Sequence, residues 1–291
     1  MVVRSRAPVR VDFAGGWTDV PPYSTEKGGM VVNATITLYA YCSLHSRENG
    51  VRIVSADFDA FVEARDIRRL EYDGNLDLVK AALKRLPVDF GMEILTRSEA
   101  PPGSGTGSSA AMGVALLGLL NYFQTERLSS HEIAELAHRL EVEELRIWGG
   151  KQDQYAAAIG GINFMEFEDP AVSTSRLNLE ATTLYELEKH LVLCYTGKSR
   201  LSGDTIARVM GAYQRGEERV VRALDGLKEV ARRMKTVLIR GDLREFGALL
   251  SQNWEYQKQL DPSITNEFME RLYEVALRSG AWGGKACGAG A

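Results

Sequence analysis

Pro101–Ala111 has the sequence Pro-Pro-Gly-Ser-Gly-Thr-Gly-Ser-Ser-Ala-Ala. Its three glycines stand at alternate positions, and two serines and a small-residue apolar run follow them. We expect a strand before the glycines, over 90–96, and a helix after them, over 108–123. A glycine-rich loop between a strand and a helix binds anions, because the backbone can approach closely and the first helical N–H groups are free. The stretch therefore predicts a site for a nucleotide phosphate, and a plain tight turn is the alternative.

Two common nucleotide loops do not fit this stretch. A Walker A loop would continue with Gly-Lys-Ser or Gly-Lys-Thr, which is absent here. A Rossmann loop would place its third glycine at position 108, whereas here it is Gly107. The acidic residue that lies about 20 positions further on, Glu126, falls in a polar helix end and not at the tip of a second strand. The stretch is therefore a phosphate loop of another kind.

The composition is that of an ordinary soluble globular protein. The 291 residues carry 35 basic and 39 acidic side chains, a net charge of −4, which gives no footing for nucleic acid or an acidic membrane. The longest apolar run, 110–120, is too short to span a bilayer, and the N-terminus has no apolar leader segment. Three cysteines far apart indicate reduced thiols and a cytoplasmic location. The length predicts one large or two closely joined domains.

The N-terminal part predicts a strand over 9–14 that ends in a turn-rich loop, Gly15–Tyr23. The loop holds two aromatic side chains, a hydroxyl and the acid Asp19, a composition typical of a ligand-binding edge. The alternative is a structural loop in which Asp19 is a cap or turn residue. Arg10 and Asp12 are charged exceptions within the apolar strand.

Hydrophobic periodicity predicts most of the remaining elements. Further strands are expected over 31–44, 51–56, 58–64, 161–167 and 190–195, the second and third of them as an antiparallel run. Further helices are expected over 76–86, 155–159, 206–213, 217–240, 243–259 and 266–279. Capping boxes are expected at Ser129 with Glu132 and at Asp242 with Glu245, and Gly280 is expected to stop the last helix.

Two acidic segments are candidates for chemistry. Glu141, Glu143 and Glu144 cluster on one helix, where one of them would meet Mg²⁺ or all would form a solvated face. In Gly149–Ala158, two glycines precede Asp153, which then enters a small-residue helix. We expect Asp153 to be semi-buried near that helix start, and a simple helix N-cap is the alternative.

Three segments together resemble the GHMP kinases. Pro101–Ala111 is similar to the second signature of that family, and Ala7–Asp19, in its Phe-Ala-Gly-Gly-x-Thr-Asp form, is similar to the first. Residues 283–290 resemble the start of the third signature, a glycine loop that packs against the phosphate loop. The sequence stops inside that loop, so we expect the C-terminal domain to be truncated at its end. The resemblance implies an α+β fold of two domains, a ribosomal protein S5 domain 2-like half over 1–185 and a ferredoxin-like half over 186–291.

The resemblance also implies roles for particular residues. The segment Gly149–Ala158 is similar to the one that carries the catalytic aspartate of sugar-phosphorylating members, so Asp153 is the expected catalytic aspartate, which accepts or orients the hydroxyl proton, with Arg10 as its partner. Mg²⁺ is expected at Ser109 and Glu141, with Glu143 and Glu144 as close competitors. The residues expected to bind ATP are Pro102, Gly103, Ser104, Gly105, Thr106, Gly107, Ser108 and Ser109. The residues expected to bind the substrate are Gly16, Trp17, Asp19 and Arg200, although a surface arginine is the alternative for the last.

The expected substrate is a sugar. The sequence of Phe13–Tyr23, together with those of 38–41 and 253–255, is most similar to the corresponding segments of kinases of D-glycero-D-manno-heptose 7-phosphate. Those kinases phosphorylate the anomeric hydroxyl. Trp17 also suits an L-fucokinase, which stays open as an alternative. A different class, a sugar and ATP sensor of the same fold that does not catalyse, stays open too. Partners other than a small sugar or sugar phosphate, in particular nucleic acid or a membrane, are not expected.

Overall fold

The computed structural model describes residues 1–197 and 203–288, and the chain divides into two compact units. Unit 1 is formed by Met1–Arg10, Thr35–Pro102 and Gly107–Gly160, and unit 2 by Val11–Ala34, Gly103–Thr106 and Gly161–Ala291. The first two strands, β1 (Val2–Ala14) and β2 (Gly29–Arg47), contribute residues to both units. Because the units are not contiguous in sequence, the domain boundary expected between residues 185 and 186 stays a prediction.

The sheet of unit 1 has the order β4-β3-β5-β2. The strands besides β2 in this order are β3 (Val51–Ser55), β4 (Ala60–Ala64) and β5 (Gly91–Ser98), and β1 also pairs with β2. β3 pairs with β4 in the antiparallel sense that the sequence predicts, but it pairs with β5 in the parallel sense. β5 is antiparallel to β2, with Thr96 opposite Cys42. The mixed sheet places the end of β5 directly before the glycine-rich loop.

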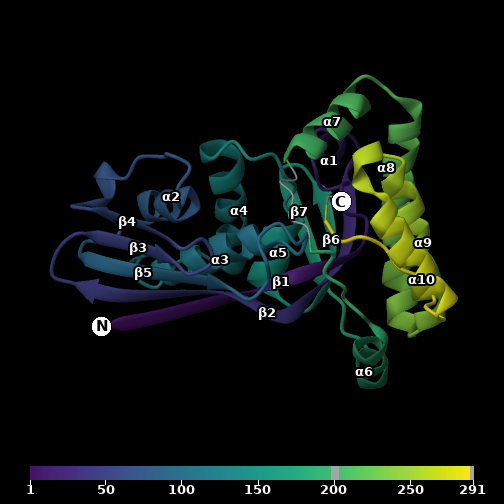
Figure 1. Cartoon of the computed structure of the whole chain (residues 1–291), viewed down its shortest axis with the longest axis horizontal. Helices are drawn as coiled ribbons and strands as arrows, with labels where there is room; N and C mark the ends of the chain where they lie inside the picture. Colours follow the sequence, from purple (N-terminus) through teal and green to yellow (C-terminus); the bar gives the residue numbers. More distant parts are fainter. Residues whose placement is uncertain (198–202, 289–291) are drawn as a thin grey trace. The chain divides into compact units, whose positions relative to one another are not determined.

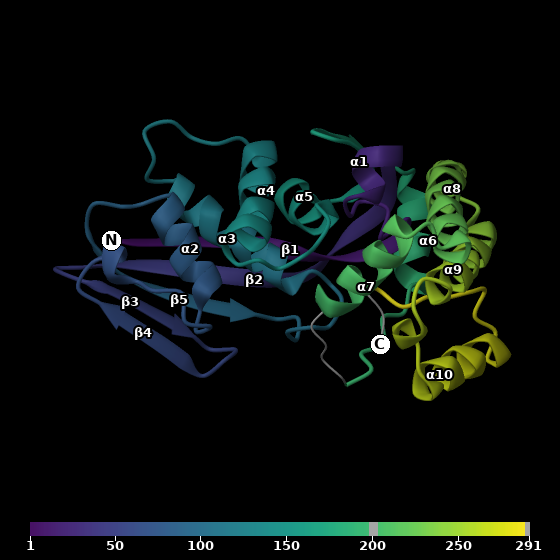
Figure 2. The same cartoon turned by 90° about the horizontal axis from the view of Figure 1, so that it is seen from above.

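Helices cover one face of this sheet (Figures 1 and 2). They are α2 (Asp77–Arg85), α3 (Ser108–Asn121), α4 (Ser130–Arg139) and α5 (Gln152–Ile159), together with the short turn η1 (Ile67–Arg69). α3 is apolar on nearly every side and is the buried centre of the layer, with Leu116, Leu117 and Leu120 fully buried. The predicted capping box of Ser129 and Glu132 opens α4. After α4 the chain continues as a π-helical turn, η2 (Leu140–Glu144).

Unit 2 combines a small sheet with a helical layer. In the sheet, the start of β2 is antiparallel to β6 (Ile162–Glu168), which is antiparallel to β7 (Ala171–Arg176). The helices are α1 (Tyr23–Lys27), α6 (Ala181–His190), α7 (Gly203–Gln214), α8 (Glu218–Arg240), α9 (Leu243–Lys258), η3 (Pro262–Ile264) and α10 (Glu267–Arg278). α8 and α9 lie side by side in both views (Figures 1 and 2), joined by a tight turn at Gly241, whose φ is +74°. None of the helices found in 1–197 and 203–288 has the length and apolar character needed to cross a bilayer.

Two local predictions are wrong. The strand expected over 190–195 does not form, because His190 ends α6 and residues 191–196 have no regular secondary structure. Val192 in this apolar segment is 86% exposed, and no described strand pairs with the segment. At the start of α9, Asp242 accepts from the Glu245 N–H, but the Glu245 carboxylate bonds to Arg233 and the capping box is only half made.

Candidate active site

Asp153 lies in the first turn of α5, where its carboxylate contacts Arg10. Two nitrogens of that guanidinium, Nε and Nη2, lie 2.8 and 2.6 Å from Asp153 Oδ1. The Arg10 side chain is 5% exposed and that of Asp153 27%, so a buried cation holds a carboxylate that solvent still reaches. The residue at the N-cap of α5 is Lys151, so the alternative that Asp153 is a simple N-cap is wrong.

The same carboxylate lies against Gly107, the residue that opens α3. Gly107 has φ +71°, and a Cβ atom there would lie 2.9 Å from Asp153 Oδ2. A side chain at position 107 would therefore collide with the aspartate and adopt a strained backbone. The third glycine of the phosphate-loop sequence is required because it brings the N-terminus of α3 next to the carboxylate.

Ser109 and Glu141 meet at the start of α3. The Ser109 hydroxyl donates to Glu141 Oε1 at 2.6 Å, and the Gln154 amide donates to Glu141 Oε2. Burial raises the pKa of Glu141 above its usual range, and the nearby Asp153 carboxylate adds to the rise. The two hydrogen bonds lower the pKa of the same group. They therefore support the charged form in a site that otherwise disfavours it.

The other two acids of this cluster have different partners. Glu143 forms an ion pair with Arg139, one turn earlier on the helix. Glu144 pairs with Arg85 and accepts a hydrogen bond from the Tyr72 hydroxyl. The π-helical turn carries Glu141 toward Ser109 and the other two carboxylates elsewhere, which favours Glu141 among the three candidates.

Ser109 and Glu141 fit a magnesium ion. Mg²⁺ takes hard oxygen ligands and usually keeps several waters or phosphate oxygens, so one hydroxyl and one carboxylate are a sufficient protein contribution. In the part of the chain that the structure describes, no three His, Cys, Asp or Glu side chains converge as a metal site.

The glycine-rich loop before α3 packs against the C-terminal tail of unit 2. Gly103 and Gly105 have φ of +69° and +76°, and the Ser104 and Thr106 hydroxyls lie 2.7 Å apart. A Cβ atom at Gly105 would lie 2.6 Å from the Cys287 carbonyl oxygen, and one at Gly288 would lie 2.8 Å from Gly105 Cα. The expectation that the two glycine loops pack together is therefore confirmed, and glycine is required on both sides of the contact.

The candidate sugar loop is a tight, buried turn. Gly16 and Trp17 lie in it, and Trp17 has φ +82° although it is not glycine. The Trp17 side chain is 5% exposed, and its indole Nε1 has no hydrogen-bond partner within residues 1–197 and 203–288. Asp19 is 3% exposed and does not cap α1, whose N-cap is Pro22. The fourth substrate candidate, Arg200, lies outside the described residues.

Comparison with known proteins gives the family. Models of the GHMP kinases N terminal domain and of the GHMP kinases C terminal domain match residues 76–161 and 234–291. The D-glycero-alpha-D-manno-heptose 7-phosphate kinase of Campylobacter jejuni is 36% identical over 296 residues, which cover 99% of this chain and 87% of that protein. This chain belongs to the GHMP kinase family.

Two further relatives bear on the kind of GHMP kinase. The crystal structure of a D-glycero-D-manno-heptose 1-phosphate kinase from Bacteroides thetaiotaomicron has a TM-score of 0.81 and 33% identity, covering 100% of this chain and 86% of that one. The bifunctional fucokinase/GDP-fucose pyrophosphorylase of Arabidopsis thaliana is 30% identical over 288 residues, which cover 92% of this chain and 27% of that protein. The predicted GHMP kinase fold is confirmed by these likenesses together with the family models.

Sequence reasoning missed two ionic groups of this GHMP kinase, one buried and one half-buried. In unit 2, Lys285 Nζ lies 2.6 Å from Asp12 Oδ2, and both side chains are 3% exposed. In unit 1, Glu135 accepts hydrogen bonds from Lys151 and Tyr155, the residues two positions either side of Asp153. A charge inside an apolar strand was the one available signal, at Asp12, but only the fold reveals its partner.

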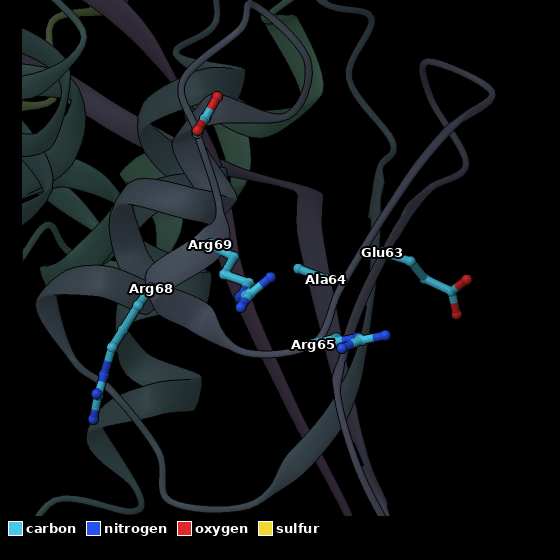
Figure 3. A pocket seen from close by; sticks show the side chains of 6 residues that line it. Glu63, Ala64, Arg65, Arg68 and Arg69 are labelled. Atoms are coloured by element: carbon cyan, nitrogen blue, oxygen red, sulfur yellow. The ribbon is translucent and has the colours of Figure 1, made fainter.

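A pocket of about 560 Å³ elsewhere in unit 1 holds none of the candidate residues. Figure 3 shows its lining side chains, which point apart and do not converge on one point. The lining residues are Glu63, Ala64, Arg65, Arg68, Arg69 and Glu71. Acids accompany the arginines, so the pocket is not a built anion site.

Proposed function

We propose that this GHMP kinase transfers the γ-phosphate of ATP to the anomeric hydroxyl of D-glycero-D-manno-heptose 7-phosphate. The observation that carries the proposal is the placement of Asp153, a solvent-reached carboxylate held by Arg10 beside the N-terminus of α3. The likeness to heptose phosphate kinases over nearly the whole chain supports the substrate class.

In the proposed reaction the protein acts mainly by positioning and by neutralising charge. The anomeric oxygen attacks the γ-phosphorus, a new O–P bond forms, and the bond from the γ-phosphorus to the β,γ-bridging oxygen breaks as ADP leaves. The hydroxyl proton passes to the Asp153 carboxylate. Arg10, whose guanidinium contacts Asp153 Oδ1, orients that carboxylate and offsets negative charge on the transferring group.

Backbone N–H groups of Gly103–Ser109 would hold the ATP phosphates, and Asp19, Gly16 and Trp17 would bind the sugar. Mg²⁺ would be held by Ser109 and Glu141, and when bound it supplies positive charge to the β- and γ-phosphates. Glu141 accepts hydrogen bonds from Ser109 at Oε1 and from Gln154 at Oε2, and these two bonds hold its carboxylate beside the Ser109 hydroxyl. With its cysteines unpaired, we place the enzyme in the cytoplasm.

Two other functions compete with this one. An L-fucokinase is supported by the Arabidopsis relative. A non-catalytic sensor of sugar and ATP would need no catalytic carboxylate. The contacts that hold the Asp153 carboxylate therefore favour an enzyme.

A panel of substrates tests the proposal. Purified protein with Mg·ATP is given heptose 7-phosphate, heptose 1-phosphate, L-fucose and galactose, and ADP release and product NMR are recorded. We expect the highest kcat/KM with heptose 7-phosphate and a new phosphate on C1. Turnover with heptose 1-phosphate would mean a different acceptor hydroxyl, because C1 is already blocked. Sugar binding without ADP release would favour the sensor.

A further inference from the structure

A chain of buried hydrogen bonds runs through α9 of unit 2. The Gly15 N–H donates to Asn253 Oδ1 at 3.0 Å, and Asn253 Nδ2 donates to Gln257 Oε1 at 3.4 Å. Gln257 Nε2 then donates to the Gly288 carbonyl oxygen at 2.9 Å. Both side chains are 1% exposed. All three bonds point the same way, and such head-to-tail bonds in a low-dielectric interior strengthen one another.

This series of hydrogen bonds ends in the two loops to which we assign ligands. At one end, Gly15 begins the turn that contains Trp17 and Asp19, and a Cβ atom at Gly15 would lie 2.0 Å from the Met30 carbonyl oxygen. At the other end, Gly288 lies against Gly105, as described above. Neither end can shift without the backbone next to it, since both contacts lack room for a methyl group.

The spacing of Asn253 and Gln257 explains why one helix serves both loops. Residues four apart lie on the same face of an α-helix, and the amides follow each other along the buried face of α9. The same helix holds the tail at a second point, where the Gly284 N–H donates to the Ser251 hydroxyl at 3.3 Å. α9 is therefore the common support of the Gly15 turn and of the tail that packs on the phosphate loop.

We propose that Asn253 and Gln257 are positioning residues that couple the Gly15 turn to the Gly103–Thr106 loop. A bound phosphate that restricts the motion of Gly105 also restricts Gly288, which packs against it. The side-chain amides of Gln257 and Asn253 then pass this restriction to the Gly15 turn, where we expect the sugar to bind. Nucleotide and sugar then strengthen each other's binding, and the coupling is the same in both directions. The ligands named here rest on the proposed function, but the coupling between the two loops does not.

Hydrogen exchange with nucleotide alone tests the coupling. Exchange of the peptide that begins at Gly15 is followed by mass spectrometry in the full-length protein, without ligand and with saturating Mg·ADP. We expect Mg·ADP to slow exchange in the Gly15 turn at least about 5-fold, the lower end of common allosteric couplings. In Gln257→Met the Gly15 N–H still has Asn253 Oδ1 as its acceptor, but the path from Asn253 to Gly288 is broken, so the response of the Gly15 turn to Mg·ADP should be lost.

The matched control is Gln259→Met. Gln259 is exposed at the C-cap of the same helix, its side-chain amide donates to the Glu255 carbonyl, and its variant should keep the response. If Gln257→Met does not fold, Gln257→Glu keeps the acceptor for Asn253 and removes the donor to Gly288.

An unchanged response in the Gln257 variants, or none in nucleotide-bound wild type, overturns the inference. No sugar is present, so a failed substrate panel with an intact response would reject the proposed substrate and leave the coupling standing.

Discussion

Neighbouring residues on α5 have different tasks. Asp153 contacts Arg10 and Gly107, whereas Gln154 bonds to Glu141. One short helix therefore positions both the expected catalytic aspartate and the carboxylate expected to hold Mg²⁺. Glu135, which accepts from Lys151 and Tyr155, fastens the same helix to α4.

Asp153→Asn should leave nucleotide binding nearly intact and lower kcat by ~10² or more. The amide has the shape of the carboxylate, but it accepts no proton and gives Arg10 no negative partner. Steady-state kinetics and calorimetric titration with Mg·ADP separate the two effects. Glu143→Gln, which removes only the pair with Arg139, is the control. Near-normal turnover in Asp153→Asn would rule out the aspartate as the base.

Trp17 combines a strained backbone with a buried side chain, and the two can be separated by unfolding experiments. Its φ of +82° costs on the order of 1–3 kcal/mol, which glycine would relieve, whereas losing a buried Trp side chain costs about 3–5 kcal/mol. Trp17→Gly should therefore destabilise the protein by clearly less than Trp254→Ala. The indole of Trp254 is 2% exposed in the middle of α9 and has no such strain to release. Urea unfolding of both variants measures the difference, and equal losses would show that the turn at position 17 is unstrained.

At the level of elements, the local hydrophobic pattern was enough to predict a half-buried strand and a fully buried helix. The alternation over 31–44 and the apolar run after Ser109 predicted β2 and α3 within a few residues. The apolar segment over 190–195 misled, because a strand also needs a partner that sequence does not display. The π-helical turn at Glu141 was invisible, since one extra residue in a turn leaves the surrounding helical period unchanged.

The candidate site was predictable for a similar reason. A glycine that the backbone requires, such as Gly107, and an acid beside glycines and small residues, such as Asp153, can be recognised in the sequence. The contacts of Gln154, Asn253 and Gln257 could not be predicted, because an amide inside a helical pattern is indistinguishable from a surface residue until its neighbours are known.

His138 on α4 predicts a pH dependence of stability. Its ring is 9% exposed, and burial, assisted by Lys151, lowers its pKa although the Gly149 carbonyl and Glu135 act in the opposite direction. The unfolded chain, with a histidine pKa of about 6.5, then binds a proton that the folded protein does not. The histidine leaves stability unaffected above pH 6.5 and reduces it as the pH falls toward the folded pKa, by up to about 1.4 kcal/mol per pH unit.

His138→Gln should remove this loss. Urea unfolding from pH 7.5 to pH 5 is the measurement, and the curves of variant and wild type should run parallel above pH 6.5 and diverge below it. Curves that stay parallel throughout would mean that His138 is protonated equally in both states.

At the scale of the whole chain, an ion pair within unit 2 joins Asp12 to Lys285, two residues that are 273 positions apart in sequence. Asp12 comes from the first strand and Lys285 from the C-terminal tail, and Lys285 Nζ also donates to the Asp12 carbonyl oxygen at 2.9 Å. Asp12 Oδ1 has no hydrogen-bond partner among the described residues, and Lys285 is the cation that compensates this buried carboxylate. The tail that packs on Gly105 is thus anchored by an ion pair that solvent does not screen.

Lys285→Met should lower the free energy of unfolding by about 3–5 kcal/mol, because it strands a buried charge. Adding Asp12→Asn removes that charge, and the double variant should recover most of the lost stability. Mg·ADP affinity should stay reduced in both variants, because neither has the ion pair that joins the tail to β1. Urea unfolding and calorimetric titration at low temperature measure the two quantities. A double variant as unstable as Lys285→Met would show that the ion pair is not the cause, and wild-type nucleotide affinity in both would show that Gly288 is held without it.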